Sequence, residues 1–279
     1  MKKVFICVDE NALFKPVCDY GIYVAKRLDA EAVFIHVIET PELGQNFYGL
    51  AAGGIVLGEN DMVMSQYGTI EGNGIEVDTE KLQKMLDDCV ANAKSQGVSA
   101  SAILRDGDFI EVIEEYKDEA RIFVLGIKGT NSEDVGFNAT MLIKEMKVPA
   151  LLVNKDFSPI NSVLVAFDGT EAAQKTLNFI KEAKLLKDAK KYVINVNNNA
   201  EASNKTLEIA KGFLSGENAE FVSVSGDVPA DEIIKYRRAN NLDLIATGAF
   251  TKSFFAKLFV GSVSEDIMHN ALVPILVLS

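Results

Sequence analysis

The sequence is poor in cysteine and histidine, and the few that are present form no reactive or metal-binding pattern. The 279 residues include three cysteines and two histidines. Cys7, Cys18 and Cys89 are odd in number and contain no C-x-x-C pair, so we expect buried small hydrophobic residues rather than a redox site. His36 falls within an expected strand and His269 within an expected helix, which favours structural roles over metal binding.

Basic residues and long apolar runs are also scarce. The chain has 28 Lys and Arg residues and 40 Asp and Glu residues, which give a net charge of −12. Nucleic acid and anionic membranes are therefore poor partners for this protein. No apolar run reaches the roughly 20 residues that cross a bilayer. The run after Met1 is cut short by Asp9 and is too short for a secretory signal. We therefore expect a cytoplasmic protein.

The chain does contain one set of landmarks that occurs twice in the same order. Each set has an apolar run ending in Asp, an amphipathic helix, a second apolar run, a Gly-Asp pair that is expected to open a helix, a run ending in Gly, and a Val-Pro pair before a last apolar run. The matching segments are 4–9 and 163–168, 32–38 and 192–196, 107–108 and 226–227, 122–126 and 244–248, and 148–149 and 273–274. Six shared landmarks indicate an internal duplication.

Short, nearly continuous apolar strands that alternate with helices are typical of parallel sheets covered on both faces. The repeat therefore predicts an α/β protein with two tandem doubly wound, parallel five-stranded sheets. The segment 156–160 is polar, contains a proline and follows a completed strand, so we expect a linker there between domains 1–155 and 160–279. The last runs, 150–153 and 275–278, would be apolar edge strands, and such edges invite pairing.

Ligands of open α/β sheets bind beyond the carboxyl ends of the strands, where the strand order reverses. In the second half this edge would gather Asp168, Val196 and the loop that begins at Gly248. Within that loop, Gly261 and Ser262 precede a helix and could cradle a phosphate. Ser262 and Glu265 also match a helix capping box, and a cap is the favoured interpretation of that motif alone. When the motif is taken together with the acid after the first strand and the two glycines, a nucleotide site is favoured.

These residues resemble the nucleotide motif of the universal stress protein family, in particular of its tandem two-domain members. The family pattern G-x-x-G-x9-G-S/T maps onto this sequence with an acid for the adenosine at the end of the first strand and a valine beside the base after the second. The corresponding second-half residues are Asp168, Val196, Gly248, Thr251, Gly261, Ser262 and Val263. The resemblance implies a Rossmann-like nucleotide-binding fold, an ATP or AMP ligand, with Mg²⁺ as an accompanying ion, and an internal pseudo-dimer.

The pattern is less complete in the first half than in the second. Thr251 is the one departure in the second half, and its Cβ would weaken binding without abolishing it. In the first half, Ala139-Thr140 or, aligned backward from Pro149, Gly136-Phe137 replaces the final glycine and hydroxyl residue. We therefore expect a weak or empty first-half site. Its candidate residues are Asp9, Val37, Gly126, Gly129 and Thr140.

The first half is also longer, because Asp9 to Pro149 spans 140 positions and Asp168 to Pro274 spans 106, and the excess of 34 lies mostly in residues 41–74. This insertion is rich in glycine but has no following Gly-Lys-Ser/Thr, which disfavours a P-loop. A mobile surface insertion and a functional lid or arm both fit a loop of this length.

No nucleophile elbow, paired-carboxylate motif or metal-ligand cluster is present, so the sequence does not indicate an enzyme. The resemblance implies a stress-response regulator whose nucleotide occupancy changes its interactions. The alternatives are a nucleotide-independent scaffold that binds another small ligand or a protein, and, third, a slow ATPase. A homodimer of the whole chain is plausible but does not follow from the sequence.

Overall fold

The computed structural model describes residues 2–39, 78–127, 137–248 and 273–278. The strands are β1 Lys3–Cys7, β2 Ala32–Ile38, β3 Ala100–Asp106, β4 Ala120–Gly126, β5 Ala150–Val153, β6 Ser162–Ala166, β7 Lys190–Val196, β8 Ala219–Val224, β9 Leu244–Gly248 and β10 Ile275–Leu278. The helices are α1 Phe14–Leu28, α4 Thr79–Ser95, α5 Phe109–Glu114, α6 Phe137–Glu145, α7 Glu171–Glu182, α8 Ala200–Phe213 and α9 Pro229–Ala239, with a 3-10 turn, η1 Lys184–Leu186.

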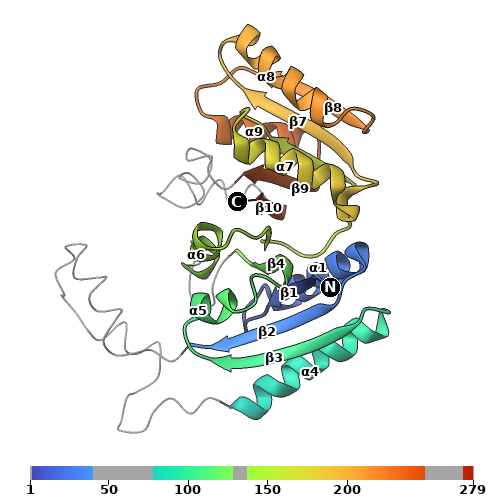
Figure 1. Cartoon of the computed structure of the whole chain (residues 1–279), viewed down its shortest axis with the longest axis vertical. Helices are drawn as coiled ribbons and strands as arrows, with labels where there is room; N and C mark the ends of the chain where they lie inside the picture. The colour runs from blue at the N-terminus through green and yellow to red at the C-terminus, as the bar shows by residue number, and fades with distance from the viewer. Residues whose placement is uncertain (1, 40–77, 128–136, 249–272, 279) are drawn as a thin grey trace, which may run out of the picture.

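The strands form one ten-stranded sheet in the order β3-β2-β1-β4-β5-β10-β9-β6-β7-β8. Neighbouring strands are parallel within β1–β5 and within β6–β10. Each set of five therefore has the same doubly wound order, and the predicted fold class is confirmed. Figure 1 shows the two sets stacked along the long axis, with β3 and β8 toward opposite ends.

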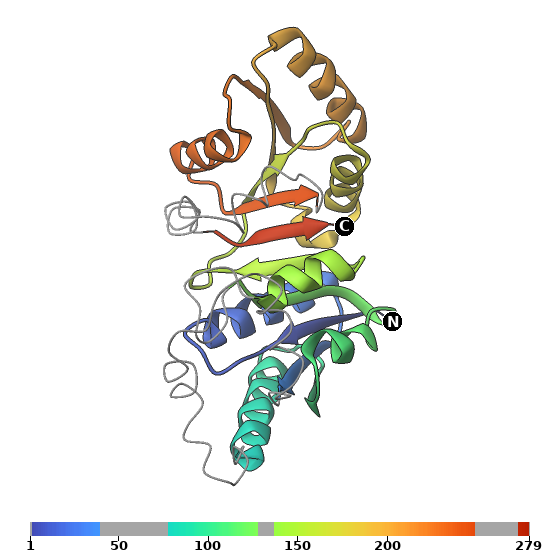
Figure 2. The same cartoon turned by 90° about the vertical axis from the view of Figure 1, so that its left-hand side faces the viewer.

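The two sets of strands meet where β5 pairs with β10, and this contact is antiparallel, with Leu151 opposite Leu276. All four residues of each strand are buried. The pairing of the two final strands that the sequence suggested is therefore present in this structure. Figure 2 shows the result from the side, with the blue-to-green half directly below the yellow-to-red half.

Helices cover both faces of the sheet, and each face has its own apolar core. One core is formed with α1, α4, α7 and α8, through residues such as Leu86 and Leu177. The other is formed with α5, α6 and α9, through residues such as Val112, Leu142 and Ile233. Strands buried on both faces must be apolar at nearly every position, which explains the continuous apolar runs in the sequence.

The Gly-Asp landmarks differ in how they start the following helix. Asp108 caps α5 by accepting the backbone N–H groups of Ile110 and Glu111, as the sequence predicted. In the second half, α9 begins at Pro229 and has no side-chain cap. Asp227 instead accepts a hydrogen bond from the side chain of Asn198 at 2.7 Å. Helix α9 therefore begins two residues after Asp227, whereas α5 begins one residue after Asp108, and Asp227 does not cap α9 as Asp108 caps α5.

The expected linker, residues 156–160, is more closely packed than its polar character suggested. The ring of Phe157 packs edge-on against Tyr20, with ring centroids 5.0 Å apart, and also contacts Tyr23. Ile160 is buried in the core on the same face. The connection between β5 and β6 is therefore held against α1.

Among the residues that the structure describes, none of the helices combines the length and the hydropathy that a bilayer crossing would require.

The contact between β5 and β10 should contribute strongly to stability. Truncating Leu276, which is fully buried, in the variant Leu276→Ala should lower the free energy of unfolding by about 2–5 kcal/mol because it leaves a cavity at the junction. Urea denaturation measures the change. The matched control is Ile209→Ala on α8, where the side chain is 47% exposed and the change should stay within about 0.5 kcal/mol. Equal effects of the two substitutions would contradict a tightly packed junction.

Candidate functional site

The strand order reverses between β6 and β9, which lie side by side in the second half of the sheet. Gly248 is the last residue of β9, and Asp168 follows the end of β6 by two positions. Val196 ends β7, the other neighbour of β6. Three residues predicted from the sequence therefore lie at the carboxyl edge of three neighbouring strands, where ligands of open α/β sheets bind.

A tight turn holds Asp168 in place. Its Oδ1 accepts the backbone N–H of Thr170 at 3.0 Å and the Thr170 hydroxyl at 2.6 Å. Thr170 in turn caps α7 by accepting the N–H of Ala173, and Gly169 supplies the positive φ of +83° that the turn needs. Asp168 is exposed, and no described residue bonds its Oδ2. This carboxylate is positioned by one oxygen and can bind a ligand with the other.

Gly248 allows the first turn of α7 to pack directly on the end of β9. A Cβ at this position would lie 2.9 Å from the backbone carbon of Ala172 and 2.9 Å from its Cβ. Real Cβ atoms do not approach other atoms so closely, so only glycine fits without movement of the backbone. This glycine therefore has a packing role in addition to any contact with a ligand.

A side-chain amide on β7 holds the backbone immediately before the Asp168 turn. Asn195 is buried, and its Nδ2 donates to the carbonyl oxygen of Phe167 at 2.7 Å, immediately before Asp168. In the first half, His36 Nδ1 lies 2.8 Å from the carbonyl oxygen of Val8, immediately before Asp9. A carbonyl oxygen can only accept, so this nitrogen carries the proton. The structural role expected for His36 is confirmed, and the two side chains occupy matching places in the repeat.

The first-half counterpart of the Asp168 turn is longer and more acidic. Asp9 accepts the N–H of Glu10 at 2.8 Å through Oδ1, and Asn11 accepts the N–H of Leu13 one residue before α1. Glu10 takes the place that glycine holds in the second half, and it forms an ion pair with Lys81 of α4 at 2.6 Å. The conformation of the turn is therefore not repeated, although the acid is.

The two halves also differ in charge at the residues that follow β2 and β7. Glu39 lies two residues after Val37, whereas neutral Asn198 lies two residues after Val196. Asn138 Nδ2 donates to Glu39 at 3.3 Å. Although Glu39 as a residue is exposed, desolvation of its carboxylate raises its pKa, and the negative charges of Asp108 and Asp9 act in the same direction.

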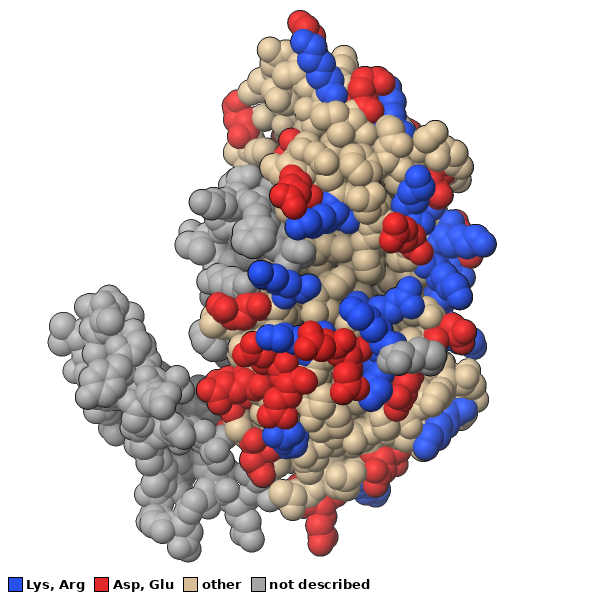
Figure 3. Space-filling view, in the orientation of Figure 1, with Lys and Arg blue, Asp and Glu red and all other residues tan. Residues whose placement is uncertain are grey.

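The two carboxyl edges therefore differ in charge. The first-half edge carries Asp9, Glu10, Glu39 and Asp108, whereas the matching second-half positions have only Asp168 and Asp227 as carboxylates. Figure 3 shows that acidic side chains also gather on the visible face over the α5 segment. The exposed acidic residues of α5 and of the turn that follows it are Glu111, Glu114, Glu115, Asp118 and Glu119.

The remaining first-half candidates lie on β4 and α6. Gly126 ends β4, as Gly248 ends β9. Thr140 and the buried Ala139 lie inside α6, which begins at Phe137. Several predicted residues fall outside the described ones, namely Gly129, Thr251, Gly261, Ser262, Val263 and His269, together with most of the insertion 41–74.

Sequence reasoning missed the pairs His36/Asn195 and Glu39/Asn198. Both pairs are 159 positions apart, as are Asp9 and Asp168, so a residue-by-residue alignment of the two halves would have found them. Within the described ranges, no group of three or more His, Cys, Asp or Glu side chains is arranged to hold a metal ion.

The geometry is that of a doubly wound α/β protein. In its second half the strand order reverses between β6 and β9, and folds of this class bind ligands at such a point. Residues 198–279 match the model of the universal stress protein family. A universal stress protein of Synechocystis sp. is 22% identical over 99% of this chain and 99% of its own length.

Two solved structures show the same fold over the whole chain. A universal stress protein from Archaeoglobus fulgidus is 17% identical with a TM-score of 0.70, covering 99% of this chain and 98% of its own. The cytoplasmic domain of a prokaryotic cation chloride cotransporter is 10% identical with a TM-score of 0.59, covering 99% and 94%. The resemblance to the universal stress protein family is thus confirmed, and residues 198–279 carry its domain signature.

The role assigned to Gly248 gives a direct test. Gly248→Ala should lower the free energy of unfolding by about 1–3 kcal/mol because the methyl group overlaps the backbone of Ala172. The matched control is Gly212→Ala in α8, where an added Cβ meets nothing within 4 Å, and alanine should stabilise the helix by up to about 1 kcal/mol. Denaturant titration of both variants measures the opposite signs. A neutral or stabilising Gly248→Ala would contradict the close approach.

Proposed function

We propose that this protein is a stress-response regulator that binds ATP or AMP through the second half of the chain, and that nucleotide occupancy changes its interactions with other proteins. The observation that carries the proposal is the geometry of Asp168. Its turn is fixed through Oδ1, and Oδ2 remains accessible at the point where the strand order reverses.

The chemistry of adenosine suits the described part of this edge. The amino and hydroxyl groups of adenosine donate hydrogen bonds, and a fixed carboxylate is a strong acceptor for them. Val196 is half-buried beside the core and offers apolar surface to the base. The resemblance assigns the ribose and phosphates to the motif that begins at Gly248 and continues through Thr251, Gly261 and Ser262, and it makes Mg²⁺ a natural companion of the phosphates.

Charge favours the second half over the first as the nucleotide site. A like charge at about 8 Å costs a phosphate about 0.5–2 kcal/mol, depending on the local dielectric constant. The carboxylates of Glu10 and Glu39 have no acidic counterparts at the second-half edge. The ion pair of Glu10 with Lys81 offsets part of this difference. Several such charges are enough to make the first-half site much weaker for a polyanion.

We also propose that the chain is organised as two domains. Residues 1–155 and 160–279 would be two domains that act as an internal pseudo-dimer through β5 and β10. A nucleotide in one domain would then lie in a molecule whose second carboxyl edge is more acidic and would favour different contacts.

The test compares two charge-neutralising substitutions at matching positions. Asp168→Asn can keep the acceptor for Thr170 but loses the negative charge, so the affinity for Mg-ATP should fall about tenfold to a hundredfold, the worth of a charge-assisted hydrogen bond. Asp9→Asn is the matched control and should leave the affinity unchanged within about twofold. Isothermal titration calorimetry measures both.

Other outcomes identify other functions. Equal loss in the two variants would assign nucleotide to both halves, and wild-type protein without affinity for ATP or AMP would favour a nucleotide-independent scaffold. Phosphate release from bound ATP would indicate a slow ATPase.

A further inference from the structure

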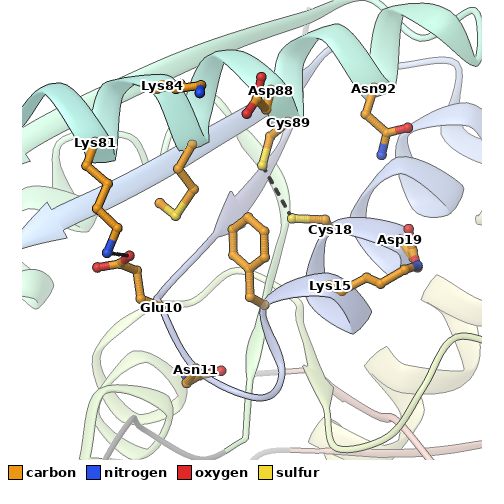
Figure 4. Close-up of a pocket in the computed structure, with 12 residues that line it drawn as sticks. Glu10, Asn11, Lys15, Cys18, Asp19, Lys81, Lys84, Asp88, Cys89 and Asn92 are labelled. Carbon is orange, nitrogen blue, oxygen red and sulfur yellow. Dashed lines mark hydrogen bonds and ion pairs between the residues drawn. The ribbon is translucent and has the colours of Figure 1, made fainter.

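A pocket of about 590 Å³ lies between α1 and α4 on one face of the first half. Figure 4 shows its ionic rim, where Lys81 pairs with Glu10 and Lys15 pairs with Asp19. In each ion pair the lysine side chain is largely exposed to solvent, and such surface pairs are weak. The pocket is therefore open to a small polar molecule.

Two thiols meet inside this pocket. The Sγ atoms of Cys18 on α1 and Cys89 on α4 are 3.6 Å apart, although the residues are 71 positions apart in the sequence. Figure 4 shows Cys89 pointing from α4 toward Cys18. Both residues are 5% exposed and line the pocket. A disulfide has its sulfurs about 2.05 Å apart, so each sulfur would need to move by only about 0.8 Å.

The pair is chemically asymmetric. Either sulfur can donate in this contact. With the Cys18 thiol as the donor, the hydrogen bond lowers the pKa of Cys89 despite its burial and the nearby Asp88. The same bond, together with burial, raises the pKa of Cys18. Because the thiolate is the nucleophile in reactions with peroxides, Cys89 is the group that would react first, and Cys18 is placed to react second.

The third cysteine lies in a different environment. Cys7 is on β1 and belongs to the core on the opposite face of the sheet from Cys18 and Cys89. Burial raises its pKa. The second half of the chain contains no cysteine at all. The dithiol is therefore particular to the first half, and Cys7 serves as an internal reference for an unreactive buried thiol.

We propose that Cys18 and Cys89 form a dithiol site that a hydroperoxide, entering through the pocket between α1 and α4, oxidises to a disulfide. The Cys89 thiolate attacks the terminal peroxide oxygen, which keeps its hydrogen as the O–O bond breaks, and the leaving alkoxide or hydroxide takes up the proton that the Cys89 thiol released and departs as an alcohol or water. The resulting Cys89 sulfenic acid is attacked by Cys18, which gives up its proton as the sulfenic oxygen leaves as water. The two thiols lose two electrons and the peroxide gains two.

The test counts thiols in the full-length protein after treatment with hydrogen peroxide, quenching and denaturation. Wild type should fall from three thiols to one, with a loss of two hydrogens in the intact mass and a peptide link between Cys18 and Cys89. Cys7→Ala should fall from two thiols to none at the same rate. Cys18→Ser should accumulate a sulfenic acid on Cys89 that a cyclic 1,3-diketone traps, and Cys89→Ser should leave Cys18 as a thiol.

Several outcomes would overturn the proposal. Three thiols that persist in wild type while glutathione in the same solution is oxidised would show that the pair is inert. A disulfide that includes Cys7, or one between two chains, would place the reactivity elsewhere. Equal trapping of sulfenic acid in Cys18→Ser and Cys89→Ser would remove the asymmetry on which the order of the two steps rests.

Discussion

The antiparallel contact between β5 and β10 is the constraint on which the rest of the molecule depends. Each strand is four residues long and buried at every position, so either half alone would expose an apolar edge with unpaired N–H and C=O groups. Such an edge aggregates or finds another strand. Joining the two edges within one chain buries both, fixes Leu151 opposite Leu276, and places the helices of both halves on common faces of one sheet.

Within this common frame the two carboxyl edges have diverged. The acid after the first strand is kept in both halves, and in both a polar side chain of the second strand bonds the preceding carbonyl group. The turn and the charge around the acid are not kept. Gly169 and Asn198 of the second half correspond in the repeat to Glu10 and Glu39 of the first half. After duplication, the second half can thus keep a carboxyl edge with few acidic residues, which suits an anionic ligand, while the first half diverges toward different contacts.

The architecture could be predicted from the sequence because buried parallel strands leave an unmistakable apolar pattern. The bounds predicted for β2 and β9 are those of the structure, and Asp168, Val196 and Gly248 lie at the expected edge. The packing of Phe157 was missed because it depends on a tertiary contact with Tyr20. The contact of Cys18 with Cys89 was missed for the same reason, since no local pattern joins residues 71 positions apart.

We propose that this chain, although its two halves are similar, binds nucleotide in the second half alone. The stoichiometry of Mg-ATP binding to the intact protein tests it most directly. Isothermal titration calorimetry at saturating nucleotide should give one site per chain, because the extra carboxylates disfavour a polyanion at the first-half edge. Two sites of similar affinity per chain would contradict the account.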